Sequence, residues 1–178
     1  MTGTTALENT LARLKRVTAP SGTSILNNRL CNMGLGLQPV PTDGMCQYHA
    51  IAVMLQQGGI SGEDASSVKG RVLTWLRENG DRELANGTTL SSFMEGHHGS
   101  WEAMCTEMER REYWGNHLTL VGAATVYDVS ISVVTSSRVA DDGVLVVEPM
   151  SNRAADHSIV IAHHAEVHYD ATVAIEAK

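Results

Sequence analysis

One stretch decides how this chain is organised: Pro39-Val40-Pro41-Thr42-Asp43-Gly44-Met45-Cys46-Gln47-Tyr48-His49-Ala50, followed by Ile51-Ala52-Val53-Met54-Leu55. The two prolines hold the residues before them extended, and Asp43-Gly44 is a turn signal. From Cys46 onward, apolar residues recur at helical spacing until Gln57-Gly58-Gly59 ends the run. The stretch therefore predicts a loop, a turn and then a helix that begins near Cys46.

A cysteine at a helix N-terminus lies in an environment that suits a nucleophile. The unpaired backbone N–H groups and the positive end of the helix dipole favour an anion, and the thiolate is the reactive form of cysteine. The same N–H groups can hold a developing oxyanion. A free cysteine is nevertheless more often a small buried hydrophobe, so a role for Cys46 needs support from elsewhere in the chain.

That support comes from a stretch near the C-terminal end that alternates like a strand, Glu166-Val167-His168-Tyr169-Asp170-Ala171-Thr172-Val173. Residues two apart on a strand project from the same face, so His168 and Asp170 should point the same way. The carboxylate could then fix the tautomer of His168 and leave its other ring nitrogen free to take a thiol proton. Together with Cys46, this pair predicts a catalytic triad.

Three separated blocks resemble the ovarian-tumour (OTU) domain family, papain-like cysteine proteases that remove ubiquitin. The blocks are Asp43-Gly44-Met45-Cys46-Gln47-Tyr48-His49-Ala50, Tyr113-Trp114-Gly115-Asn116-His117-Leu118-Thr119-Leu120 and Glu166-Val167-His168-Tyr169-Asp170. They are similar to the family's nucleophile box, its central Trp-Gly box and its closing His-Tyr-Asn/Asp box. The resemblance extends from about residue 26 to residue 175, and the three blocks are specific only when taken together.

The resemblance implies an α+β (mixed α/β) papain-like fold, in which a small central β-sheet is packed between helical layers. It implies a deubiquitinase that hydrolyses the peptide or isopeptide bond after the C-terminal glycine of ubiquitin. Cys46 would be the nucleophile, His168 the general base and acid, and Asp170 the group that orients His168. Asp43 is a further candidate catalytic residue, expected to shape the loop rather than to carry a proton. Backbone amides at Asp43, Gly44 and Cys46 would form the oxyanion hole.

The central block supplies two candidate supporting residues, Trp114 and Asn116. Trp114 is equally consistent with an ordinary core aromatic, and Asn116 also predicts the start of a helix. Met45 departs from the family, which usually has a polar Asn or Ser at this position. Two alternatives therefore stay open: a catalytically weak or inactive ubiquitin-binding module, and a cysteine hydrolase for another ubiquitin-like modifier.

The composition is typical of a soluble globular protein. The 178 residues suit one domain with a sizeable core, predicted as an OTU domain over residues 23–178 behind a helical arm over residues 1–22. A net charge of −7 argues against binding to nucleic acid or to an anionic membrane, and it suits a basic partner such as the arginine-bearing tail of ubiquitin. Cys31, Cys46 and Cys105 form no recognisable disulfide framework, which favours a reducing compartment. We expect a monomer in the cytoplasm, with the nucleus as a second location.

Helices are predicted mainly in the first two thirds of the chain and strands in the last third. Apolar residues at 7, 11 and 14 predict an amphipathic helix that packs on its own domain or binds a partner. Ser24 is predicted to cap a second helix that ends at Gly34. Further helices are expected over residues 61–79, 90–94, 100–108 and from 116, and strands over 131–134, 144–147, 159–161 and 166–175. The charged residues between 107 and 112 predict a solvated face, and no secretory signal or transmembrane span is expected.

Two groups of histidines raise the question of a metal site. His97-His98 lies between glycines, where adjacent side chains do not converge easily on one ion. The second group consists of His157, His163, His164 and His168. It does not follow the spacing of a Cys/His finger, and no cysteine lies nearby. We therefore expect no metal and no cofactor.

Overall fold

The computed structural model describes residues 21–84, 86–94, 96, 98–137, 142–151 and 154–175. In chain order the elements are α2 (Gly22–Asn32), β1 (Leu35–Gln38), α3 (Cys46–Gln57), α4 (Ala65–Glu78), the 3-10 helix η1 (Leu90–Phe93), α5 (Trp101–Met108), α6 (His117–Tyr127), β2 (Val129–Thr135), β3 (Val144–Val147), β4 (His157–His164) and β5 (His168–Ala174). The predicted arm over residues 1–22 lies outside the described residues except for its last two positions. The predicted α+β class is confirmed.

The strands form one mixed sheet in the order β1-β5-β4-β2-β3. β2 and β4 run parallel, whereas the other neighbouring pairs are antiparallel. β5 therefore lies inside the sheet, hydrogen-bonded to β4 along its first half and to β1 along its second. This double pairing fixes the strand that carries His168 and Asp170.

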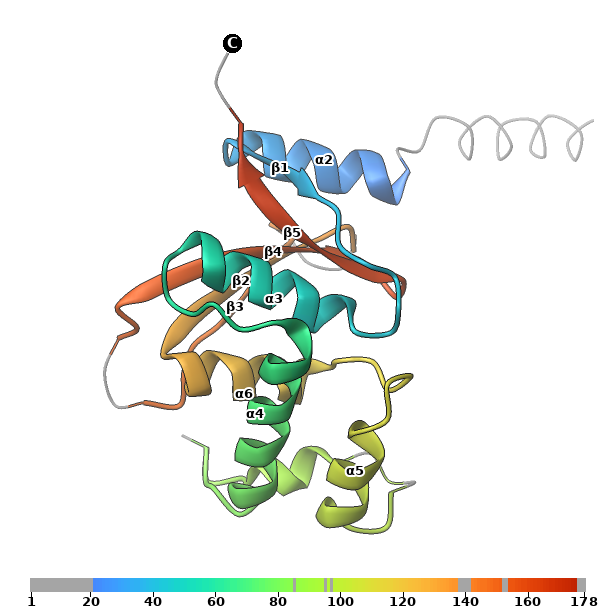
Figure 1. Ribbon diagram of the computed structural model, residues 1–178, viewed down its shortest axis with the longest axis vertical. Helices are drawn as coiled ribbons and strands as arrows, with labels where there is room; N and C mark the ends of the chain where they lie inside the picture. The colour runs from blue at the N-terminus through green and yellow to red at the C-terminus, as the bar shows by residue number, and fades with distance from the viewer. Residues whose placement is uncertain are drawn as a thin grey trace, which may run out of the picture.

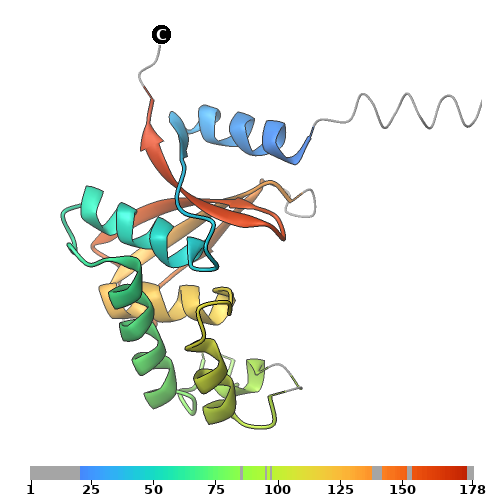
Figure 2. The same cartoon turned by 45° about the vertical axis from the view of Figure 1, so that its right-hand side comes forward.

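The sheet separates two unequal helical layers (Figure 1). On one face α3 packs against β5 and β4, α6 packs against β2, and α4 and α5 lie beyond them. On the other face α2 is the only helix that the structure describes, as the turned view in Figure 2 shows. Its Leu26 and Leu30 form a small apolar cluster with Val134 and Ala162 of the sheet. The expected sheet between helical layers is thus confirmed, with most of the core on the α3 side.

Local sequence signals account for where the helices begin. Asp64, Ser100 and Asn116 each accept a hydrogen bond from the backbone N–H three residues on, and so cap α4, α5 and α6. The starts of α5 and α6 are as predicted, whereas α4 begins at Ala65 and not at residue 61. The predicted cap of α2 is wrong, because Ser21 and not Ser24 takes that position. The N–H of Ser24 donates to the Ser21 hydroxyl, which places Ser24 inside the first turn.

The predicted strand over residues 166–175 is wrong at its start. Residues 165–167 form a turn, and the N–H of Val167 donates to the carbonyl of His164. Glu166 has a φ of 59°, a left-handed conformation that a strand does not contain. The chain therefore forms a tight β4–β5 hairpin in which His164 pairs with His168.

Among the described residues, none of the helices combines the length and the apolar character needed to span a bilayer.

Candidate active site

Cys46 is the first residue of α3, as predicted. Met45 occupies the N-cap position and makes no side-chain capping bond, so the first N–H groups of the helix stay available for another acceptor. Cys46 is 8% exposed, and the helix behind it is anchored by fully buried residues such as Ile51 and Leu55. The thiol is thus held on a rigid element at the positive end of a helix dipole.

His168 and Asp170 point the same way from β5. Nε2 of His168 lies 3.0 Å from Oδ1 of Asp170. An ionised carboxylate only accepts hydrogen bonds, so Nε2 carries the hydrogen and Nδ1 keeps its lone pair. The arrangement leaves Nδ1 of His168 as the nitrogen that can accept a proton.

Two adjoining hollows, of about 270 and 250 Å³, bring the distant segments together, and we call them the Cys46 cleft. Both are lined by Cys46, Trp114, Val167 and His168. Trp114 is 56% exposed and Val167 is 67% exposed, so two large apolar side chains stand at the surface of the cleft. The reading of Trp114 as an ordinary core aromatic is therefore wrong.

Asp43 organises the loop in front of Cys46. Its Oδ1 accepts the N–H of Met45 at 3.1 Å, and its Oδ2 lies 3.2 Å from Nε2 of His49 and 2.7 Å from the guanidinium of Arg111. Desolvation acts to raise the pKa of Asp43, but these hydrogen bonds outweigh it and lower the pKa to about 2. Asp43 is therefore ionised near neutral pH, and its three partners belong to the loop, to α3 and to the segment after α5.

Gly44 lets the loop approach its neighbour closely. Its φ is 84°, a conformation that residues with a Cβ rarely adopt, and a Cβ there would lie 2.8 Å from the carbonyl oxygen of Arg111. The charged residues 107–112 were predicted to form a solvated face. The structure leaves residues 109–112 exposed, which confirms the prediction for them, although Arg111 also contacts the loop before Cys46. Glu107 is only half-buried, and its carboxylate lies 2.9 Å from Nδ1 of His98.

Gln47 connects α3 to the start of α6. Its side-chain N–H donates to the carbonyl of Asn116, and its oxygen accepts from the hydroxyl of Thr119 at 2.6 Å. A side chain on Gly115 would overlap the Gln47 amide, which explains the glycine next to Trp114. Asn116 caps α6 and lines the cleft, so the central block lies beside the nucleophile helix.

Asp170 has two partners besides His168. The N–H of Val40 donates to Oδ1, and Nε2 of His164 lies 3.0 Å from Oδ2. Strand alternation indicated His168 but not His164, because the position of the hairpin turn was not recognised. Had Glu166 been taken as a turn residue, the pairing of His164 with His168 would have followed.

His163 and His98, from the two groups of histidines, have other partners. His163 stacks on Tyr169 with ring centroids 4.5 Å apart, and burial lowers its pKa. His98 contacts Glu107 and the hydroxyl of Tyr113, while His97 lies outside the described residues. In the part of the chain that the structure describes, no three His, Cys, Asp or Glu side chains are grouped so as to hold a metal ion.

A comparison with protein-family models matches residues 41–172 to the family described as OTU-like cysteine protease. The chain belongs to this family. Among curated proteins, OVARIAN TUMOR DOMAIN-containing deubiquitinating enzymes 10 and 9 of Arabidopsis thaliana are 30% and 28% identical over 146 and 145 residues. The alignments cover 82% of this chain but 36% and 37% of those proteins, so the chain spans about a third of their length.

Solved OTU structures share the fold. The OTU domain of OTUD1 superposes with a TM-score of 0.65 at 13% identity, covering 85% of this chain and 94% of that one. An OTU domain solved in complex with ubiquitin superposes with a TM-score of 0.57 at 18% identity, covering 78% of this chain and 69% of that one. At these identities the likeness establishes the fold of the OTU domain and nothing finer.

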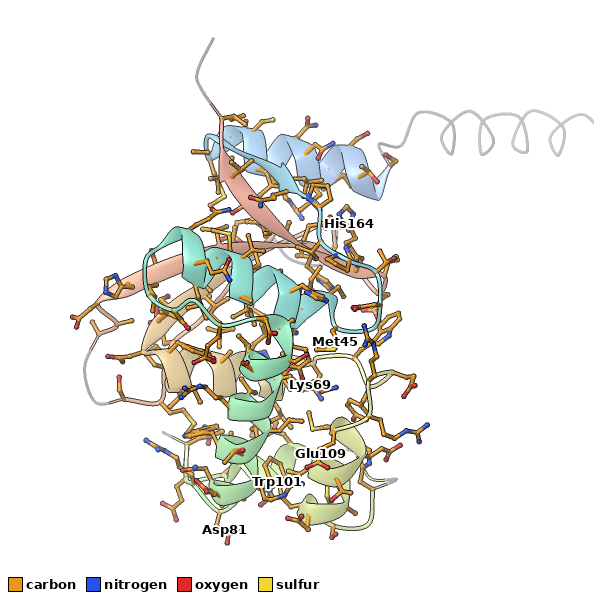
Figure 3. All side chains as sticks on the ribbon, in the orientation of Figure 1. Met45, Lys69, Asp81, Trp101, Glu109 and His164 are labelled. Carbon is orange, nitrogen blue, oxygen red and sulfur yellow. The ribbon has the colours of Figure 1, made fainter. Side chains whose placement is uncertain are left out.

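Met45 is the position where this OTU domain departs from the family's polar residue. Its side chain is 7% exposed and belongs to the main core. It lines a hollow together with Lys69 of α4, and Figure 3 labels Met45 at the start of α3 with Lys69 below it. The backbone N–H of Met45 still donates to Asp43. The methionine therefore fills an apolar site without removing the hydrogen bond that shapes the loop.

Proposed function

We propose that this chain is a deubiquitinase that uses a cysteine to hydrolyse the bond after the C-terminal glycine of ubiquitin. The observation that carries the proposal is the 3.0 Å hydrogen bond between His168 and Asp170, beside a cleft that Cys46 and His168 both line. The names of the two plant relatives support ubiquitin as the substrate.

In the proposed mechanism, Nδ1 of His168 takes the proton of Cys46 and the thiolate attacks the carbonyl carbon. Backbone amides of the loop and of the first turn of α3 stabilise the oxyanion, with those of Asp43, Gly44 and Cys46 as the candidates. The N–H of Met45 is already bonded to Asp43. His168 then protonates the departing amine and activates water against the thioester, while Asp170 holds the ring.

Asp43 has a different role in this proposal. Its hydrogen-bond partners are the N–H of Met45, His49 and Arg111, and none of them is His168. We assign it to loop geometry. No step requires a metal or a cofactor, and a reducing, cytoplasmic location remains a prediction from the three free cysteines.

The test is intact mass after incubation with ubiquitin that carries a thiol-reactive group at its C-terminus. Wild type should gain one ubiquitin, and Cys46→Ala should gain none because the nucleophilic sulfur is gone. Turnover of a ubiquitin C-terminal amide should be lost in the same variant. Cys105→Ala, which removes another buried cysteine, is the matched control and should keep the adduct.

The same experiment separates the two alternatives. An inactive ubiquitin-binding module would bind ubiquitin without forming the adduct. A hydrolase for another modifier would react with a probe built on that modifier and not with the ubiquitin probe. The Met45 side chain is buried, and its backbone N–H still donates to Asp43. Because the loop keeps this hydrogen bond, the structure favours an active enzyme over the inactive module.

A further inference from the structure

The carboxylate of Asp170 is bound by two imidazoles. Nε2 of His168 lies 3.0 Å from Oδ1 and Nε2 of His164 lies 3.0 Å from Oδ2. The rings are tilted by 38° with centroids 6.1 Å apart. Because a carboxylate only accepts, both rings must present an N–H to it while Asp170 is ionised.

The hairpin explains why two histidines reach one acid. His164 is the last residue of β4 and His168 the first of β5, and they are directly paired across the turn. Asp170 lies two residues further along β5 and so projects from the same face. Figure 3 labels His164 beside the sheet on the side where α2 lies.

Burial makes this second bond important. The Asp170 side chain is 9% exposed, and a buried carboxylate needs hydrogen-bond donors to stay ionised. The N–H of Val40 and His168 both bond to Oδ1, whereas His164 bonds to Oδ2. Donors on both oxygens restrain rotation of the carboxylate, which in turn holds Oδ1 toward His168.

His164 does not share the cleft with the nucleophile. It lines a separate hollow of about 560 Å³, together with Asp170, His168 and the α2 residues Gly22 and Thr23. Neither hollow that contains Cys46 is lined by His164. Its hydrogen bond therefore acts on the reaction through Asp170, which bonds to His168 in turn.

We propose that His164 is a positioning residue, which fixes the Asp170 carboxylate from the side opposite His168 and so keeps the base aligned with Cys46. The inference rests on the proposed function for its reaction, but its geometry does not depend on the substrate. The donor is Nε2 of the ring. A glutamine places an amide N–H at a similar distance from the backbone, whereas a phenylalanine keeps the ring shape and has no donor.

The test measures kcat and KM on a ubiquitin C-terminal amide for His164→Phe and His164→Gln. His164→Phe should lower kcat about tenfold, the loss of one hydrogen bond to a buried charged group, with KM changed less than twofold. The kcat of His164→Gln should lie within about threefold of the wild-type kcat, because the amide restores a donor. His157→Phe and His157→Gln, at the exposed far end of the same strand, are the matched controls and should leave kcat unchanged.

A second readout needs no ubiquitin. The rate of alkylation of Cys46 by iodoacetamide at neutral pH, followed by peptide mass, reports how well His168 activates the thiol. It should fall in His164→Phe and recover in His164→Gln, while the exposed Cys31 in the same sample reacts equally in all variants. Thermal melts confirm that each variant is folded at the assay temperature.

The outcomes separate this inference from the proposed function. If ubiquitin substrates fail but alkylation of Cys46 follows the Phe and Gln pattern, the proposed function is overturned and the role of His164 stands. The positioning role is overturned if folded His164→Phe matches wild type in the alkylation rate and in kcat. It is also overturned if His164→Gln and His164→Phe lower these two quantities by the same factor.

Discussion

Two carboxylates flank the nucleophile, and they are bonded in similar ways. Asp43 in the loop before α3 accepts one backbone N–H, from Met45, and contacts His49 and Arg111. Asp170 on β5 also accepts one backbone N–H, from Val40, and contacts two histidines. Each acid joins its own segment to parts of the chain remote in sequence.

The two acids differ in exposure and in the part of the site that their hydrogen-bond partners belong to. The side chain of Asp43 is 26% exposed and its partners fix the backbone of the loop. The side chain of Asp170 is 9% exposed and one of its partners, His168, lines the cleft with Cys46. In the proposed mechanism the two acids therefore divide the work: Asp43 shapes the loop before Cys46, and Asp170 orients His168.

Among the substitutions that test the difference between the two acids, Asp170→Ala should have the largest effect on kcat. It should lower kcat by about 10²–10³, because His168 loses the group that selects its tautomer and orientation, yet leave a weak residual rate. The measurement is steady-state hydrolysis of a ubiquitin C-terminal amide by variants whose circular dichroism matches wild type. A complete loss equal to that of Cys46→Ala would show that Asp170 does more than orient.

A smaller effect is expected from Gly44→Ala. The substitution forces a positive φ on alanine and presses its Cβ against the carbonyl of Arg111, so the free energy of unfolding should fall by about 1–3 kcal/mol. Denaturant titration measures it. Gly59→Ala is the matched control, since Gly59 has a φ of 65° but no heavy atom within 4 Å of the added Cβ. If both variants lose the same free energy of unfolding, the close approach of Gly44 to Arg111 does not cause the destabilisation.

Much of this arrangement was predictable from local signals. The turn at Asp43-Gly44 and the helical spacing after it gave the start of α3 correctly, and alternation placed His168 and Asp170 on one face. These features depend on residues that are neighbours in sequence. Their geometry follows from the periods of helix and strand.

The partners of the two acids were not predictable in the same way. Arg111 reaches Asp43 across 68 positions, and Val40 reaches Asp170 across 130. Nothing local signals such contacts. The hairpin turn was missed because Glu166 adopts a left-handed conformation usually taken by glycine or asparagine. That single error hid the pairing of His164 with His168.

The smallest expected effect is the pH dependence introduced by Asp43→Asn. The pKa of Asp43 is lowered from 3.8 to about 2 in the folded protein, so its ionised form stabilises the fold above pH about 4. That contribution is lost as the pH falls toward 2. The stability difference between wild type and Asp43→Asn should therefore be largest at neutral pH and shrink below pH about 4, as measured by denaturant titration at several pH values.

The exposed Asp81→Asn is the control for that series and should show no such trend. A difference between wild type and Asp43→Asn that stays constant down to pH 2 would mean that the charge of Asp43 contributes nothing to the loop.

The most direct test of the division between the two acids is a double-mutant cycle on kcat/KM. Asp170→Ala and Asp43→Ala are each combined with His168→Ala, and the residual rates are compared. Residues that act as one unit are strongly non-additive. We expect Asp170→Ala to lower kcat/KM almost no further once His168 is gone, whereas Asp43→Ala should lower kcat/KM by the same factor with or without His168. If Asp170→Ala retains its full effect without His168, the claim that Asp170 acts through His168 is contradicted.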